Sequence, residues 1–181
     1  MNHVLITGAT GFVGGHLAER LRSRGTAVTA LVRNPARGRF LESLGVRLLQ
    51  GELDGGPIFP DDLDAVFHLA GMTRARRTAD YYSVNQKCTA SLLGSLLEHG
   101  LRPRFVFLST TAAGGPSPDG RPLREDDPPR PVSDYGQSKL LGEEAVLSRK
   151  EDLPVSIVRV GPVYGPRDPG FLDYFKVVRR G

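Results

Sequence analysis

Three glycines at every third position near the start of the chain constrain its fold more than any other feature. They lie in the stretch HVLITGATGFVGGHLAERL, where an apolar run over residues 4–7 gives way to a helical pattern over residues 12–24. Gly8 permits a tight turn, Gly11 leaves space for an anion against the backbone, and Gly14 lets the helix pack near the strand. The N–H groups at such a helix start lack intrahelical partners and bind phosphate. The motif predicts a dinucleotide-binding strand–turn–helix unit, and the alternative is a turn without a ligand.

Short apolar segments alternate with helical patterns along the rest of the chain. Strands are predicted at residues 4–7, 27–32, 46–49, 65–69, 105–109 and 155–160. Helices are predicted at residues 12–24, 35–44, 79–99, 134–149 and 171–180. This alternation predicts one α/β domain over residues 1–181, a doubly wound parallel sheet of the Rossmann type with helices on both faces and strands buried on both sides. The Pro- and Gly-rich residues 114–131 predict one long loop with a functional role.

Composition and charge exclude several classes of protein. An apolar content of 39% with 24% charged residues is typical of an ordinary globular protein. The single cysteine and the scattered histidines exclude a disulfide framework or metal cluster, and we expect a cytoplasmic location. We expect no membrane role, because no stretch approaches the ~20 apolar residues of a spanning helix. The net charge of +4 comes without aromatics interleaved among the arginines, so we expect no nucleic-acid partner.

The residues after the second predicted strand favour one of the two nicotinamide dinucleotides. An acid at this position accepts hydrogen bonds from a ribose 2′-hydroxyl, whereas the stretch ALVRNPARGR offers Arg33, Arg37 and Arg39. A guanidinium matches the geometry and charge of a 2′-phosphate, so NADP is preferred, with NAD as the alternative cofactor. A solvated basic surface is the other interpretation of these arginines.

Tyr135 and Lys139 form a candidate acid/base pair. On a helix that begins near Asp134 they lie four residues apart on one face. A lysine ammonium beside a phenol would stabilise the phenolate and lower its pKa, which makes a general base for a hydroxyl. Their position one helix after a Ser/Thr cluster at a strand end supports this interpretation, because open α/β sheets bind ligands at that edge. An exposed helix pair without a function is the alternative.

Several motifs together resemble one family. They are TGATGFVG at 7–14, FHLAG at 67–71, VNQKCTASLL at 84–93, FLSTTAAGG at 107–115, YGQSK at 135–139 and VRVGPVYGPRD at 158–168. Over essentially the whole chain the sequence resembles an extended short-chain dehydrogenase/reductase of the NAD(P)-dependent epimerase/dehydratase group. The resemblance implies hydride transfer at a hydroxyl or carbonyl carbon of a small-molecule substrate, either a nucleotide-sugar or a sterol- or flavonol-like compound. A non-catalytic NADP-binding sensor is the alternative function.

The resemblance also assigns catalytic roles. Tyr135 is the acid/base and Lys139 also holds the nicotinamide ribose. Thr111 takes the place of the serine or threonine that binds the reacting oxygen, with Thr110 and Ser109 as neighbouring alternatives. Asn85 helps to build the proton path or, alternatively, faces solvent. His68, within the fourth strand, is expected to be a packed core residue.

The motif and the resemblance together predict the cofactor bed. The resemblance places Glu52 and Leu53 beside the adenine, and Glu52 is a departure from the usual aspartate because its longer side chain need not reach the same N–H donor. The predicted cofactor-binding residues are Gly8, Thr10, Gly11, Phe12, Val13, Gly14, Arg33, Glu52, Leu53, Leu69, Ala70, Gly71, Tyr135, Lys139, Pro162 and Val163.

The resemblance also bears on the end of the chain and on its assembly. Similar proteins continue into a smaller C-terminal region that covers the substrate, so we expect this substrate region to be absent or truncated here. An exposed apolar surface and self-association would follow, and we expect this chain to be weakly active or inactive, because excluding water and orienting the substrate need that region. The family often dimerises through two long helices, which correspond to residues 79–99 and 134–149 in this chain.

Overall fold

A six-stranded parallel sheet forms the centre of the protein. The computed structural model describes residues 1–180. The strands are β1 (His3–Thr7), β2 (Ala27–Val32), β3 (Arg47–Gln50), β4 (Ala65–His68), β5 (Arg104–Thr110) and β6 (Val155–Val160). Their order across the sheet is β3-β2-β1-β4-β5-β6, and every neighbouring pair is parallel. The predicted doubly wound parallel sheet is confirmed, and each predicted strand boundary agrees to within one residue.

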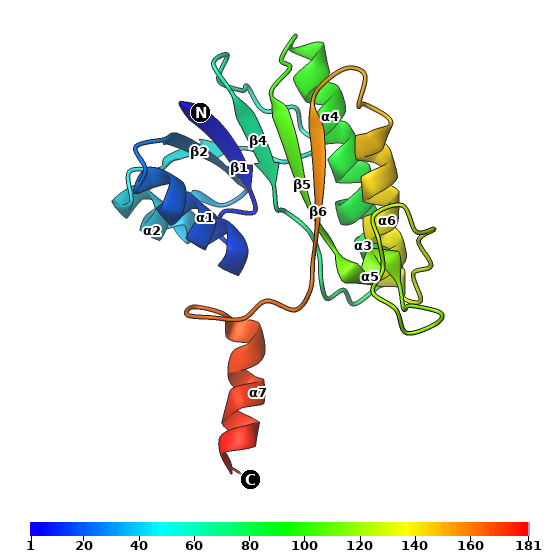
Figure 1. Cartoon of the computed structure of the whole chain (residues 1–181). Coiled ribbons are helices and arrows are strands. Elements are labelled where there is room, and N and C mark those ends of the chain that lie inside the picture. Colours follow the sequence, from blue (N-terminus) through cyan, green and yellow to red (C-terminus); the bar gives the residue numbers. More distant parts are fainter. Residues whose placement is uncertain (181) are drawn as a thin grey trace.

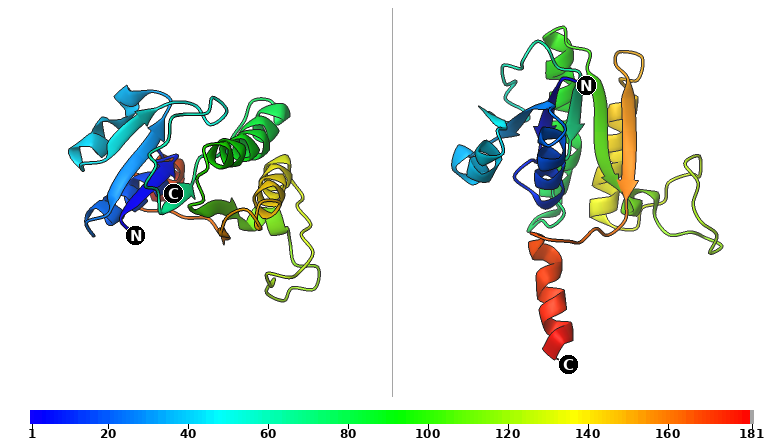
Figure 2. Two further views of the ribbon diagram at one scale, coloured as in Figure 1. Left: turned by 90° about the horizontal axis from the view of Figure 1, so that it is seen from above. Right: turned by 60° about the vertical axis from the view of Figure 1, so that its left-hand side comes forward.

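Helices cover both faces of the sheet (Figure 1). Helices α1 (Phe12–Arg22) and α2 (Arg39–Ser43) lie on one face, and α3 (Thr78–Tyr82), α4 (Cys88–Glu98) and α6 (Asp134–Leu147) lie on the other. Strand β1 serves both layers, because Val4 and Ile6 enter the core beneath α1 while Leu5 packs with Phe105 and Phe107 on the opposite face. The one-turn helix α5 (Thr111–Gly114) directly follows β5, whereas α7 (Pro169–Arg180) points away from the sheet (Figure 2). Within residues 1–180 no helix is both long and apolar enough to cross a bilayer.

Two predicted helices contain turns of other types. The predicted helix at 35–44 begins as a 3₁₀ turn, η1 (Pro35–Gly38), in which the Asn34 side chain accepts a hydrogen bond from the N–H of Ala36. The predicted helix at 79–99 is interrupted by a π-helical turn, η2 (Ser83–Lys87), between α3 and α4. Apolar spacing does not distinguish such turns from an α-helix, and π turns often occur at functional sites.

The expectation that all strands are buried on both faces is wrong for the edge strand β3, whose side chains are half-buried or exposed, and for β5 and β6. Side chains of β5 alternate between buried and half-buried, and those of β6 are half-buried or exposed, with Val158 44% exposed. Strands β5 and β6 are partly exposed on one face because, within the described residues, α1 and α2 cover that face of the sheet only over β1, β2 and β3. Further exposed apolar side chains follow at Val163, Tyr164, Leu172, Phe175, Val177 and Val178. An exposed apolar surface is therefore present as expected, and self-association stays a prediction.

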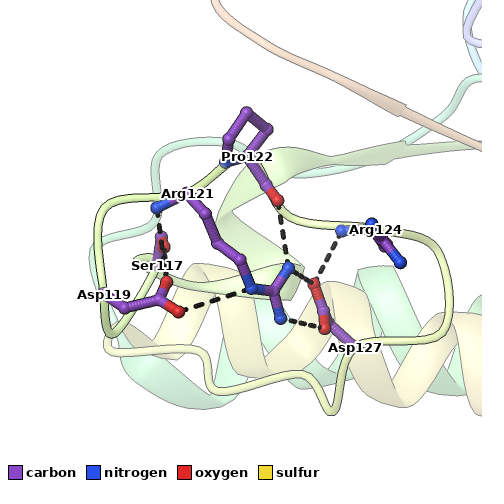
Figure 3. Close-up of polar contacts among 6 residues, drawn as sticks. All are labelled: Ser117, Asp119, Arg121, Pro122, Arg124 and Asp127. Carbon is purple, nitrogen blue, oxygen red and sulfur yellow. Dashed lines mark hydrogen bonds and ion pairs between the residues drawn. The ribbon is translucent and has the colours of Figure 1, made fainter.

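The predicted long loop connects α5 to α6 and projects from the sheet (Figure 2). Its tip is organised around Arg121, whose guanidinium donates to both carboxylate oxygens of Asp127 at 2.8 and 2.6 Å and to the carbonyl of Pro122 at 3.1 Å (Figure 3). Hydrogen bonds from Arg121 and from the backbone N–H of Arg124 lower the pKa of Asp127 to about 2. At the base of the loop, the N–H of Arg130 donates to Gly114, which holds the start of α6 beside α5.

Candidate functional site

Two adjoining clefts follow the carboxyl edge of the sheet. One, of about 630 Å³, extends from the ends of β2 and β3 to the glycine turn, and the other, of about 410 Å³, lies between β4, β5, β6 and α6. Both are lined by Leu69, Gly71 and Thr73, so they form one continuous groove. The predicted site residues line this groove, with the exception of Phe12, Gly14 and Asn85.

The glycine turn has the geometry expected from the motif. Gly8 has a φ of +72°, and a Cβ at this position would lie 2.6 Å from the backbone nitrogen of Ala70. A Cβ on Gly14 would lie 2.8 Å from the Cα of Ala9, inside the turn itself. The predicted roles of Gly8 in the turn and of Gly14 in packing are therefore confirmed.

The outer side of the same turn suits an anion. A Cβ on Gly11 would meet only the carbonyl oxygen of Gly8, at 3.2 Å, so the remaining space faces the groove. No side chain caps α1, and its first turn contains no acid, whereas Thr110 caps α5 and Ser133 caps α6. The N–H groups and positive dipole end of α1 are thus available to a phosphate. The residues present fit a pyrophosphate.

Charged side chains of both signs line the β2–β3 end of the groove. Arg33 and Arg37 lie there, and Arg39 is not among the lining residues. The acids Glu52 and Asp54 line the same end. Both arginines are exposed, so each is free to reorient toward a ligand phosphate. The sequence therefore located two basic groups correctly at this end of the groove, and their effect on cofactor choice stays a prediction.

Asn85 is fully buried, which contradicts the alternative that it faces solvent. Its Oδ1 accepts from the N–H of Met72 at 2.8 Å, and its Nδ2 donates to the carbonyl of Met72 at 3.0 Å and to Oγ of Ser138 at 2.9 Å. Because Ser138 precedes Lys139 on α6, Asn85 joins the segment after β4 to the helix that carries the candidate catalytic pair. Its predicted part in a proton path stays a prediction.

Phe12, which was predicted to bind the cofactor, packs with its side chain against the segment that follows β6. Its ring packs edge-on against His16 with a centroid distance of 5.2 Å. A Cβ on Gly165 would lie 3.4 Å from the ring, so Phe12 lies against the segment that follows β6. The nearby Nε2 of His16 lies 2.8 Å from the carbonyl oxygen of Pro166. Phe12 therefore helps to hold the chain that leaves the groove and is not itself part of the groove wall.

Lys139 is a buried cation at the centre of the second cleft. Its side chain is 4% exposed, its Nζ donates to the carbonyl of Leu108 at 2.7 Å, and it lies 4.0 Å from the centre of the Phe107 ring. Burial lowers the pKa of Lys139 to about 8, and the carboxylate of Glu143 opposes this shift. The amine of Lys139 therefore loses its proton at a pH closer to neutrality than an exposed lysine does.

The expected lowering of the Tyr135 pKa is wrong for this structure. Burial raises the pKa of Tyr135, and a hydrogen bond with Thr110 opposes the rise. The physical reason is that the Lys139 ammonium is directed to the carbonyl of Leu108, so burial of the phenol outweighs any stabilisation of the phenolate. Tyr135 is accordingly a protonated phenol at neutral pH.

The threonine that contacts Tyr135 is Thr110, one position before the predicted Thr111. Thr110 also accepts a hydrogen bond from the N–H of Ala112 at 3.2 Å and so starts α5. Thr111 is exposed and lines the same cleft. The contact with Tyr135 is therefore made by Thr110, which was the neighbouring alternative to Thr111. The role of Thr111 toward a reacting oxygen stays a prediction.

Sequence reasoning missed a partly buried ion pair beneath the cleft, between the buried Glu143 and the half-buried Arg159. Glu143 continues the spacing of Tyr135 and Lys139 by four more residues on α6, a signal that was present in the sequence. The guanidinium of Arg159 on β6 donates to Glu143 Oε2 at 2.6 Å and to Oε1 at 2.9 Å, and the Ser109 hydroxyl also donates to Oε1. This group fixes the carboxyl ends of β5 and β6 to α6 and thereby positions the segment that contains Pro162 and Val163.

Comparisons with known proteins agree with this geometry. A model of the NAD dependent epimerase/dehydratase family matches residues 4–177. A ceramide reductase of Caulobacter vibrioides (strain NA1000 / CB15N) is 34% identical over 98% of this chain and 51% of its own length. A UDP-glucose 4-epimerase of Azospirillum brasilense is 32% identical over 78% of this chain and 42% of its own. The structure of MoeE5 in complex with UDP-glucuronic acid and NAD superposes with a TM-score of 0.81 at 30% identity, covering 98% of this chain and 60% of that one. The chain spans about half the length of these curated relatives.

The packing role of Gly14 gives a testable prediction. Gly14→Ala should lower the free energy of unfolding by about 1–3 kcal/mol, because its methyl group would overpack the turn. Gly94→Ala is the matched control, since a Cβ at this helical position meets nothing within 4 Å, and it should stabilise the protein by about 0.5–1 kcal/mol. Denaturant unfolding measures both variants, and equal stabilities would contradict the packing role.

Proposed function

The chain belongs to the NAD-dependent epimerase/dehydratase family, and from this premise we propose that it is a nicotinamide-dependent oxidoreductase acting on a hydroxyl or carbonyl carbon. The observation that carries the proposal is the continuous groove that joins the glycine turn to Tyr135 and Lys139. Because the chain spans about half the length of its curated relatives, the activity, substrate and partners of the whole protein belong to the proposal. The names of the relatives support either a nucleotide-sugar or a lipid-like small molecule as substrate.

The glycine turn and the start of α1 would hold the pyrophosphate of the dinucleotide. Lys139 would hold its nicotinamide ribose, and Pro162 and Val163 would form the wall beside the ring. When bound, the cofactor supplies or accepts a hydride at C4 of its nicotinamide. The dinucleotide would then extend along the groove, from the basic residues at the β2–β3 end to Tyr135 and Lys139 at the opposite end.

Tyr135 would move the proton that accompanies hydride transfer. In the reducing direction its phenol donates the proton to the substrate oxygen, and in the oxidising direction the phenolate takes the proton from the substrate hydroxyl. The raised pKa of Tyr135 supports the donor role, because the phenol is protonated at neutral pH. Lys139, fixed by Leu108, places a positive charge in the cleft where the phenolate would form.

The proposed cofactor is NADP, with NAD as the alternative. Arg33 and Arg37 both line the β2–β3 end of the groove, where a 2′-phosphate would lie. Glu52 and Asp54 line the same end and favour an unphosphorylated ribose, so the choice depends on which charges reach the ligand. We give the arginines greater weight because their planar forks match a phosphate.

Association and location remain predictions from the sequence. We propose a homodimer formed through the helices of residues 79–99 and 134–149, a cytoplasmic location, and no nucleic-acid or membrane partner. A dimer with a two-fold axis would pair the same helix faces of both copies.

Tyr135→Phe tests the catalytic proposal. Turnover by this chain is measured as oxidation of NADPH or NADH with a panel of nucleotide-ketosugars and long-chain ketones, and as reduction of NADP or NAD with the corresponding nucleotide-sugars and alcohols. The variant should reduce the rate with the best panel member by about 10²–10⁴-fold, because no other group replaces the phenol proton, and should bind the dinucleotide within about twofold of the wild type. Unchanged turnover would contradict the role of Tyr135. Tight dinucleotide binding with the same residual turnover in Tyr135→Phe and in the wild type would favour the sensor function.

Arg33→Ala combined with Arg37→Ala tests the cofactor preference. The double variant should lose at least about tenfold in affinity for NADP, while its affinity for NAD stays within about twofold, because only NADP carries the 2′-phosphate. Arg39→Ala is the control, since it removes one arginine charge from the same basic stretch but outside the lining of the groove. Equal losses for the two dinucleotides in a calorimetric titration would contradict a selective role for Arg33 and Arg37.

A further inference from the structure

A chain of hydrogen bonds crosses the centre of the protein through His68. This residue ends β4 and is fully buried. Its Nδ1 lies 2.7 Å from the hydroxyl of Thr7 at the end of β1, and its Nε2 lies 3.0 Å from the hydroxyl of Thr89 on α4. The imidazole stacks on Phe107 with a centroid distance of 5.6 Å. Both ring nitrogens are therefore occupied inside an otherwise apolar layer.

The neighbouring bonds fix the positions of the protons. The Thr89 hydroxyl donates to the carbonyl of Asn85 at 2.8 Å, so its oxygen accepts from His68 Nε2–H. The oxygen of Thr7 accepts from the N–H of Ala70 at 3.2 Å, and its hydroxyl proton goes to His68 Nδ1. The opposite tautomer would leave Nε2 without a donor. All four hydrogen bonds therefore donate in the same direction along the chain. They run from the Ala70 N–H through the neutral imidazole to the Asn85 carbonyl.

Protonation of the imidazole would break this order, because both ring nitrogens would then be donors. Burial, followed by the positive charge of Lys139, lowers the pKa of His68 to about 3. The neutral form is therefore the stable one throughout the neutral range. A buried polar group of this kind is tolerated only because all its hydrogen bonds are made.

Both ends of the chain return to the segment that lines the groove. At one end, the backbone nitrogen of Ala70 lies where a Cβ on Gly8 would approach to 2.6 Å. At the other end, Asn85 holds Met72 through two hydrogen bonds. Between them, a Cβ on Gly71 would lie 3.2 Å from Asn85 Oδ1 and 3.7 Å from Lys139 Nζ. Residues 70–72 are thus fixed from two sides, next to the glycine turn and next to Lys139.

We propose that His68 is a positioning residue that couples the glycine turn to the Asn85–Lys139 side of the groove by fixing residues 70–72 between Thr7 and Thr89. The proposal deepens the proposed function and rests on it where the dinucleotide is concerned. An apolar side chain of equal size would fill the same volume but would leave the hydroxyls of Thr7 and Thr89 without their shared partner. Loss of the hydrogen-bond chain should therefore weaken dinucleotide binding more than an equal loss of packing does.

The first experiment needs no dinucleotide. Nitrogen-15 NMR of the His68 side chain should show a neutral imidazole protonated at Nε2 between about pH 5.5 and pH 8. Thr89→Val removes the hydroxyl while keeping the shape of the side chain, and it should shift the backbone amide of Ala70 and the side-chain amide of Asn85. A charged imidazole, the Nδ1–H tautomer, or an unchanged Ala70 amide in Thr89→Val would overturn the proposal.

The second experiment compares Thr89→Val with Val66→Ala for binding of NADPH and NADH by fluorescence titration. Val66 is the matched control, because it lies two residues before His68 on the same face of β4, is fully buried and carries no polar group. Each variant's stability is measured by denaturant unfolding. Thr89→Val should weaken binding of the better dinucleotide by about tenfold, while Val66→Ala changes it by less than about twofold.

The outcomes separate the two proposals. Equal binding losses in Thr89→Val and Val66→Ala would overturn the positioning role, since packing alone would then explain both. Failure of the wild-type chain to bind either dinucleotide would contradict the proposed function, and the NMR measurements would still decide whether His68 couples residues 70–72 to Asn85.

Discussion

The close backbone contact between the β1–α1 turn and the end of β4 is the constraint on which the rest of the structure depends. No side chain fits at Gly8 between the turn and Ala70, and none fits at Gly14 between the helix and the turn. The contact aligns the carboxyl ends of neighbouring parallel strands and leaves the uncapped start of α1 facing the groove. Strand order then brings β5, β6 and α6 to the same edge, so the acid/base pair lies beside the glycine turn.

Buried polar groups are concentrated beneath this edge of the sheet. Lys139 and Glu143 are buried residues of α6, Asn85 lies on the π turn η2 and bonds to α6, and His68 ends β4 and bonds to α4. Each has defined partners: Lys139 donates to the carbonyl of Leu108, and Glu143 pairs with the guanidinium of Arg159. Burying any of these groups without partners would cost free energy. The interior therefore specifies one arrangement of the groove through directional bonds, whereas the apolar layers alone specify only its shape.

Sequence patterns predicted the parts of the structure that depend on local periodicity and backbone sterics. The strands, the glycine turn and the location of Tyr135 and Lys139 at the strand ends are of this kind. Features that depend on tertiary packing were not predictable in the same way. The π turn that buries Asn85 has the same apolar spacing as an α-helix, and the pKa of Tyr135 depends on where the Lys139 amine is directed. The ion pair of Glu143 joins elements whose proximity no local pattern indicates, although its helical spacing was visible.

We propose that a nicotinamide dinucleotide lies along the groove from Arg33 to Lys139. The most direct test is an NMR titration of the nitrogen-15-labelled chain with NADP and NAD, in which the backbone amides report the location of the ligand. Saturable binding is expected, with the largest shifts in the glycine turn and the start of α1 at residues 8–14, at Arg33, at Gly71 and around Lys139. Absence of saturable shifts with either dinucleotide, or shifts confined to α7 and the loop before α6, would contradict it.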